Sequence, residues 1–145
     1  MATKSFTVGS ISVNAAMASA IAQDEILSIV SSEIIQRAAM AARGGLEMGE
    51  KILVPMFMAM SSQAKQRVAS VLLERAFVSG TARLDDHHQP ILGTARKVSV
   101  ADFQGKMVEY NTLLAQLLLW NFEDFFTWLS DAVRSDAPAQ EATAP

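Results

Sequence analysis

The stretch from residue 111 to residue 133, NTLLAQLLLWNFEDFFTWLSDAV, constrains the fold more than any other part of the chain. It holds six leucines, three phenylalanines and two tryptophans in 23 residues, without a glycine or a proline. This composition predicts a helix, and on a wheel of about 100° per residue one broad sector is apolar. The expected core face contains Leu114, Leu118, Leu119, Phe122, Phe125, Phe126, Leu129 and Val133. A helix with so wide an apolar face has to pack in the interior of a domain.

A second, narrower apolar seam runs along the same helix through Leu113, Leu117 and Trp120. Trp120 shares its side of the helix with Asp124 and Asp131, and two seams require two neighbours. Either the helix is sandwiched between other helices of one bundle, or the seam packs against another protein chain with Trp120 as its anchor. Docking on a membrane surface is less favoured, because an interfacial helix carries Lys and Arg on its polar side rather than acids.

The composition supports one domain with more apolar surface than a soluble monomer needs. A chain of 145 residues can bury a core without a covalent staple. Hydrophobic residues make up 50% of it and charged residues 19%, with a mean hydropathy of +0.21, so part of its surface is expected to be covered by a partner chain, another copy or a membrane. The absence of cysteine excludes disulfides and thiolate metal sites. A net charge of −3 without a clustered basic face argues against a nucleic-acid partner.

Two further helical blocks precede the aromatic helix. Residues 15–43 contain many alanines and no glycine or proline, Asn14 is a suitable N-cap, and the Gly-Gly pair that begins at Gly44 should end the helix. Residues 46–78 form the second block, in which Pro55 has to break, kink or start a helix.

The second block contains a methionine-rich run, ILVPMFMAM. Its methionines Met56 and Met58 suit two interpretations, because the flexible thioether side chain fills irregular gaps in cores and also adapts to partners. Core filling is favoured, and an adaptable binding surface is the alternative.

The segments between and beside the helices are expected to be extended or irregular. Residues 5–13, SFTVGSISV, alternate polar and apolar, which predicts an extended arm or a small hairpin with Phe6 and Val8 on one face. Residues 79–99 lack a helical period and predict a long loop or a β-arm. Ser99 should cap a long helix that runs to about residue 134.

These patterns together predict an all-α fold. We expect a small bundle of four to five helices, with an extended N-terminal arm over residues 1–13, a single helical domain over residues 14–135 and a flexible tail over residues 136–145. The tail, DAPAQEATAP, is too rich in alanine, proline and acids to bury apolar area.

Residues 80–96, GTARLDDHHQPILGTAR, are the stretch most suggestive of chemistry. Asp85, Asp86, His87 and His88 carry metal-ligating atoms, but adjacent side chains point in different directions and the chain has no other histidine. The repeated Gly-Thr-Ala-Arg tetrapeptide lacks the spacing of a phosphate-binding loop. No catalytic triad is possible without a cysteine, a Gly-x-Ser-x-Gly motif or a separate histidine. We therefore predict no enzymatic activity, no metal and no cofactor.

The favoured function is a non-enzymatic structural or interaction subunit that self-associates through apolar helix faces and extended arms, as a bacterial or phage assembly component. The candidate interaction residues are Leu113, Leu117, Trp120, Trp128, Met56, Met58, Phe6 and Val8. A small adaptor or chaperone, which would hold a partner's helix in a groove of methionines and aromatics, is the alternative. A metal-dependent enzyme at residues 85–88 is less favoured.

Targeting signals are weak. The apolar stretch after Lys4 is interrupted by Gly9, Ser10, Ser12 and Asn14, so it is a poor secretory signal. No apolar run approaches the roughly 18 to 20 residues of a membrane-spanning helix. We expect a cytoplasmic protein or a component of an assembled particle.

Overall fold

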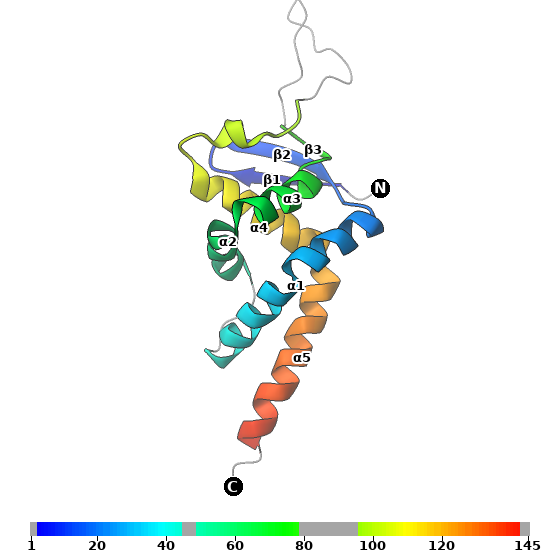
Figure 1. Ribbon diagram of the computed structural model, residues 1–145, viewed down its shortest axis with the longest axis vertical. Helices are drawn as coiled ribbons and strands as arrows, with labels where there is room; N and C mark the ends of the chain where they lie inside the picture. The colour runs from blue at the N-terminus through cyan, green and yellow to red at the C-terminus, as the bar shows by residue number, and fades with distance from the viewer. Residues whose placement is uncertain (1–2, 45–48, 79–95, 143–145) are drawn as a thin grey trace, which may run out of the picture.

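A computed structural model describes residues 3–44, 49–78 and 96–142 of the chain. Within this part the elements are, in order, β1 (Thr3–Val8), β2 (Ile11–Ala16), α1 (Ala20–Arg43), α2 (Glu50–Ala59), α3 (Ser62–Leu72), β3 (Ala76–Val78), the 3-10 helix η1 (Val100–Phe103), α4 (Met107–Asn121) and α5 (Glu123–Ala142). The strands form an antiparallel sheet in the order β1-β2-β3. Figure 1 shows the sheet beside α4, with α1 and α5 running away from it toward the C-terminus.

The first two strands form a hairpin rather than a free arm. Val8 pairs with Ile11 across a turn in which Gly9 has a φ of +59°, a conformation that glycine adopts without strain. The alternating pattern places Phe6 and Val13 in the core and the polar side chains between them in solvent. The prediction of an all-α fold is wrong, because these strands pair with each other and β2 pairs with β3 in one sheet. Residues 5–13 form the small hairpin that their alternation offered beside a free arm.

Asn14 lies inside β2 and does not cap a helix. Its Oδ1 accepts a hydrogen bond from the Ser5 hydroxyl of the neighbouring strand. The next residue, Ala15, pairs with Lys4 on one side and with Ala76 on the other. Pairing on both sides outweighs the helix propensity of the alanines, so the helix expected from residue 15 begins only at the start of α1.

The next two helices follow the sequence signals in part. α1 is one continuous helix that ends at Arg43, just before Gly44, as predicted. Pro55 lies inside α2, whereas the chain breaks at Met60, and the Ser61 hydroxyl then caps α3 by accepting the Ala64 N–H at 3.3 Å. The methionine-rich run is therefore split from the amphipathic helix that follows it.

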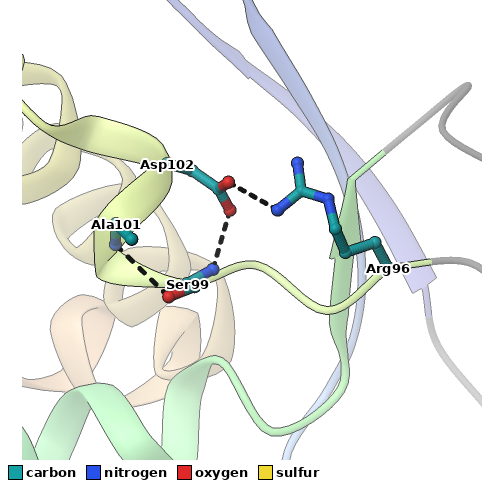
Figure 2. A network of polar contacts seen from close by, with 4 residues as sticks. All are labelled: Arg96, Ser99, Ala101 and Asp102. Carbon is teal, nitrogen blue, oxygen red and sulfur yellow. Dashed lines mark hydrogen bonds and ion pairs between the residues drawn. The ribbon is translucent and has the colours of Figure 1, made fainter.

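The Ser99 cap is confirmed, but it starts only the short helix η1. In Figure 2 the Ser99 hydroxyl accepts the Ala101 N–H, while the Asp102 carboxylate accepts the Ser99 N–H and pairs with the Arg96 guanidinium. Gly105, with a φ of +77°, separates η1 from α4. The single long helix expected over residues 100–134 is therefore three elements.

Asn121 marks the second break, between α4 and α5. Its side-chain Oδ1 accepts the Ala18 N–H at 2.9 Å, and its backbone carbonyl accepts a hydrogen bond from the Gln23 amide at 3.1 Å. These contacts tie the start of α1 to the end of α4 and take polar groups out of the helical ladder. α5 then extends through Ala142, so the helix includes residues 136–142, where the sequence predicts a flexible tail.

α4 lies at the centre of the core and packs against α2, β1 and α3. The predicted core face of the aromatic segment is confirmed for five side chains that are buried: Leu114, Leu118, Phe122, Phe126 and Leu129. Leu119 and Phe125 pack against this core while partly exposed, and Val133 lies outside the residues whose side chains are described. No helix in the described ranges is long and apolar enough to cross a membrane.

The two outer edges of the sheet differ. The Val78 N–H donates to the Arg96 carbonyl at 2.8 Å and the Val98 N–H to the Ala76 carbonyl at 3.0 Å, so residues 96–98 cover the outer edge of β3. β1 forms the other edge. Residues 79–95, with the predicted loop or β-arm, the first Gly-Thr-Ala-Arg copy and Asp85 to His88, lie outside the described residues.

Candidate interaction surfaces

Five of the eight predicted interaction residues lie in the core of the chain. Leu113, Leu117 and Met56 are 0% exposed, and Phe6 and Val8 are 7% and 4% exposed. Their positions do not support contact with another chain, because the chain itself covers them. The buried methionine also removes half of the methionine pair expected to line a partner groove.

Trp120 is partly buried and meets another element of the same chain. Its ring lies edge-on against Phe6 of β1, with a centroid separation of 5.6 Å and an interplanar angle of 65°. Of the two interpretations of the second seam, this position favours a helix sandwiched between neighbours within one chain.

The remaining two predicted residues, Trp128 and Met58, are 60% and 53% exposed. Trp128 lies on α5 and Met58 on α2. Of the two, Trp128 packs against other aromatic rings. Its ring is 5.9 Å from that of Phe125, which in turn stacks edge-on with buried Phe126 at 5.6 Å. The exposed Trp128 ring therefore packs on Phe125, whose own ring packs on the buried Phe126.

The groove between α1 and α5 at this position is named the Trp128 surface. It has a volume of about 410 Å³. The residues that line it are Ala20, Gln23, Asp24, Leu27, Phe122, Asp124, Phe125 and Trp128. Apolar and aromatic side chains line it together with Gln23 and two acids, Asp24 and Asp124, and many protein interfaces combine such groups.

A second groove, of about 710 Å³, lies on another side of α5 and is named the β1 groove. The residues that line it are Lys4, Ser5, Phe6, Thr7, Glu50, Gln116, Leu119, Trp120, Glu123, Phe126, Thr127 and Ser130. Four of them are consecutive in β1, and successive side chains of a strand point to opposite faces. The groove must therefore border the edge of β1 rather than one face of the sheet.

Acids outnumber bases among the residues that line the β1 groove. Glu50 and Glu123 are the acids and Lys4 is the base, and the Lys4 Nζ lies 5.6 Å from the Phe6 ring centroid. Gln116 also lines the groove, but its Oε1 atom is buried and out of reach of a guest. A ligand that brings positive charge suits this groove.

Sequence reasoning missed the β1 groove for an identifiable reason. The alternation of residues 5–13 indicated a strand, but which strand forms the edge depends on the pairing of β2 with β3, far along the chain. The signal that was present is the polar outer face of β1, with Ser5 and Thr7 alternating with apolar residues.

Catalytic chemistry finds no support in the described ranges. They contain no group of three or more His, Asp and Glu side chains placed to hold a metal ion, and His87 and His88 lie outside them. Partial burial lowers the pKa of Lys65 and raises the pKa of Tyr110, and the Lys65 Nζ lies 5.5 Å from the Tyr110 ring centroid. Since burial is the cause of both shifts, the pair is explained as a packing contact.

Comparisons of the chain with protein-family models, with curated proteins and with solved structures found no match. Function therefore has to be inferred from the two surfaces themselves.

Proposed function

We propose that this chain is a non-enzymatic interaction subunit that self-associates, and that the Trp128 surface is the contact it uses. The observation that carries the proposal is the exposure of Trp128, which is 60% despite its aromatic support from Phe125. Tryptophan is among the residues most enriched at interface hot spots, where an apolar centre is enclosed by a polar rim. Gln23 and Asp24 are polar side chains that line the same groove.

Further support comes from apolar side chains exposed on several elements. Large hydrophobic residues that are exposed include Ile21, Ile35, Met40, Met58, Phe77, Val100, Met107, Val108 and Trp128. Single exposed apolar residues are ordinary, but exposure on α1, α2, β3, α4 and α5 suits a subunit with more than one neighbour. An assembly component of bacterial or phage type, which the sequence favours, remains a prediction.

The alternative function, an adaptor that binds a partner's helix in a groove of methionines and aromatics, has less support. A methionine and aromatic groove for a partner's helix would need Met56 at the surface, and that side chain is in the core. Contact with a membrane surface is also disfavoured, because Asp24 and Asp124 flank Trp128.

Sedimentation velocity of the native chain over a concentration series tests the proposal. We expect reversible assembly, and we expect Trp128→Ala to weaken it by about 2 kcal/mol or more, which is roughly thirtyfold in the dissociation constant. The unfolding free energy should change by less than about 0.5 kcal/mol, as for a surface substitution.

Val108→Ala is the matched control, since Val108 is also 60% exposed but lies in the first turn of α4. Val108 does not line the Trp128 surface, so this substitution should weaken assembly much less than Trp128→Ala. A native chain that stays monomeric throughout the series, or a Trp128→Ala variant that assembles as tightly as the native chain, contradicts the proposal.

A further inference from the structure

The edge of β1 offers backbone groups to the β1 groove. Hydrogen-bonded and non-bonded pairs alternate along an antiparallel ladder, and the pair that closes a two-residue turn, Val8 with Ile11, is a bonded one. Phe6 is therefore bonded to β2, whereas the N–H and C=O of Ser5 and Thr7 point to the outer edge. No described residue forms a backbone hydrogen bond with that edge. A row of such groups is a template for another strand.

The side chains around this edge define what kind of strand it fits. Phe6 and Trp120 provide an aromatic floor, held together by their edge-on contact. Glu50 and Glu123 supply carboxylates. Two carboxylates face one ammonium, so the groove favours a positively charged guest.

We propose that the β1 groove binds an extended segment of a partner protein, which adds to β1 as a further strand. The segment carries a Lys or Arg that faces the groove, with apolar residues at the alternate positions on either side of it. The six residues of β1 offer an edge of about 20 Å at roughly 3.4 Å per residue. This binding activity is separate from self-association, because Glu123 and Trp128 lie on different sides of α5.

A second copy of the chain is a less suitable occupant of the same edge. Pairing two β1 strands around a two-fold axis would bring a second Lys4, but with it a second Glu50 and a second Glu123, so the guest would carry two carboxylates for its one ammonium. Like charges placed close together at an interface are unfavourable. A basic segment of a different protein avoids this repulsion.

Fluorescence anisotropy with a labelled synthetic peptide, acetyl-TVTKTVT-amide, tests the proposal on the native full chain. The valines and the lysine then share one face, as the groove requires. We expect saturable binding, and an at least tenfold loss of affinity when glutamate replaces the peptide's lysine.

Two N-methylated peptides distinguish strand addition from charge attraction. One carries the methyl groups on the threonine amides and the other on the valine and lysine amides, so both keep the same charge and side chains. Only one set of amides faces β1 in an added strand. We expect one peptide to lose binding at least tenfold and the other to retain it.

Charge reversal on α5 locates the site. Glu123→Lys should weaken peptide binding at least tenfold, whereas Asp124→Lys, an equal change of charge in the same helical turn, should leave it unaltered because Asp124 lines the Trp128 surface. Circular dichroism shows whether both variants fold. Trp128→Ala should bind the peptide normally, so the failure of self-association and the failure of peptide binding are separate results.

The proposal is overturned by any of three results: no saturable binding of the peptide, equal binding of both N-methylated peptides, or equal effects of Glu123→Lys and Asp124→Lys. It is also overturned in favour of a second copy if Ser5→Pro, which removes an outward N–H, disrupts self-association while Trp128→Ala does not.

Discussion

The helices α4 and α5 are both rich in large apolar side chains, yet they differ in what surrounds them. In α4 the core residues Leu113 and Leu117 are 0% exposed although they lie outside its expected core face. In α5, Leu129 is buried while Trp128, its neighbour in the sequence, is 60% exposed. Apolar content therefore indicates that a face is covered, but only the number of neighbouring elements decides whether the same chain covers it.

The largest loss of stability that would test this comparison of α4 with α5 is expected from a substitution in α4. Leu117→Ala should lower the unfolding free energy by about 2.7 to 5 kcal/mol, because it opens a cavity in a fully buried site. Urea unfolding, extrapolated to water, measures it. A loss below about 1 kcal/mol together with weaker assembly would mean that the seam through Leu117 faces another chain.

An intermediate effect is expected at Trp120, which is only partly buried. Trp120→Ala should cost about 2 kcal/mol of stability, less than the roughly 3 to 5 kcal/mol of a fully buried aromatic residue. In a double-mutant cycle with Phe6→Ala, a coupling of about 0.5 to 1.5 kcal/mol is expected from the edge-on contact. Zero coupling would show that the two rings do not meet in solution.

The smallest of the three effects concerns the contact between the hairpin turn and α4. Gly9→Ala should cost about 1 to 2 kcal/mol, because Gly9 has a φ of +59°. A Cβ built there would also lie 2.5 Å from the Oε1 atom of Glu109. Thermal unfolding measures the loss, and adding Glu109→Ala should recover only the part due to the clash.

Gly105→Ala is the control for that measurement, since Gly105 also has a positive φ, of +77°, but a Cβ there would meet nothing within 4 Å. It should cost only the backbone strain, and so less than Gly9→Ala. Equal losses at the two glycines would remove the reason for assigning Gly9 a role in docking the hairpin on α4.

Signals that act within a few residues of sequence allowed correct predictions. The end of α1 before Gly44 and the cap at Ser99 with Asp102 in the first turn both depend on local backbone chemistry. The broad apolar sector of the aromatic segment likewise identified Leu114 and Leu118 as core residues.

Features that depend on distant partners could not be predicted in this way. β3 has only the three residues Ala76–Val78, too few for a readable alternation, and without it β2 has no second neighbour. The break after Asn121 contains no glycine or proline, and its cause is the contact with Ala18 and Gln23 at the start of α1. Both grooves depend on these contacts between distant residues. The sequence therefore could not show that, of its aromatic candidates Phe6, Trp120 and Trp128, only Trp128 is largely exposed.

The hydrogen bond between Val78 and Arg96 also bears on how the length of the connection between them can vary. It fixes the two ends of residues 79–95 next to each other at the edge of β3, independently of what joins them. Doubling the length of a flexible connection costs only about 0.6 kcal/mol of closure entropy. We therefore expect a longer connection between Val78 and Arg96 to add little to the cost of closing this edge of the sheet, which makes the position a suitable point for grafting a new segment by design.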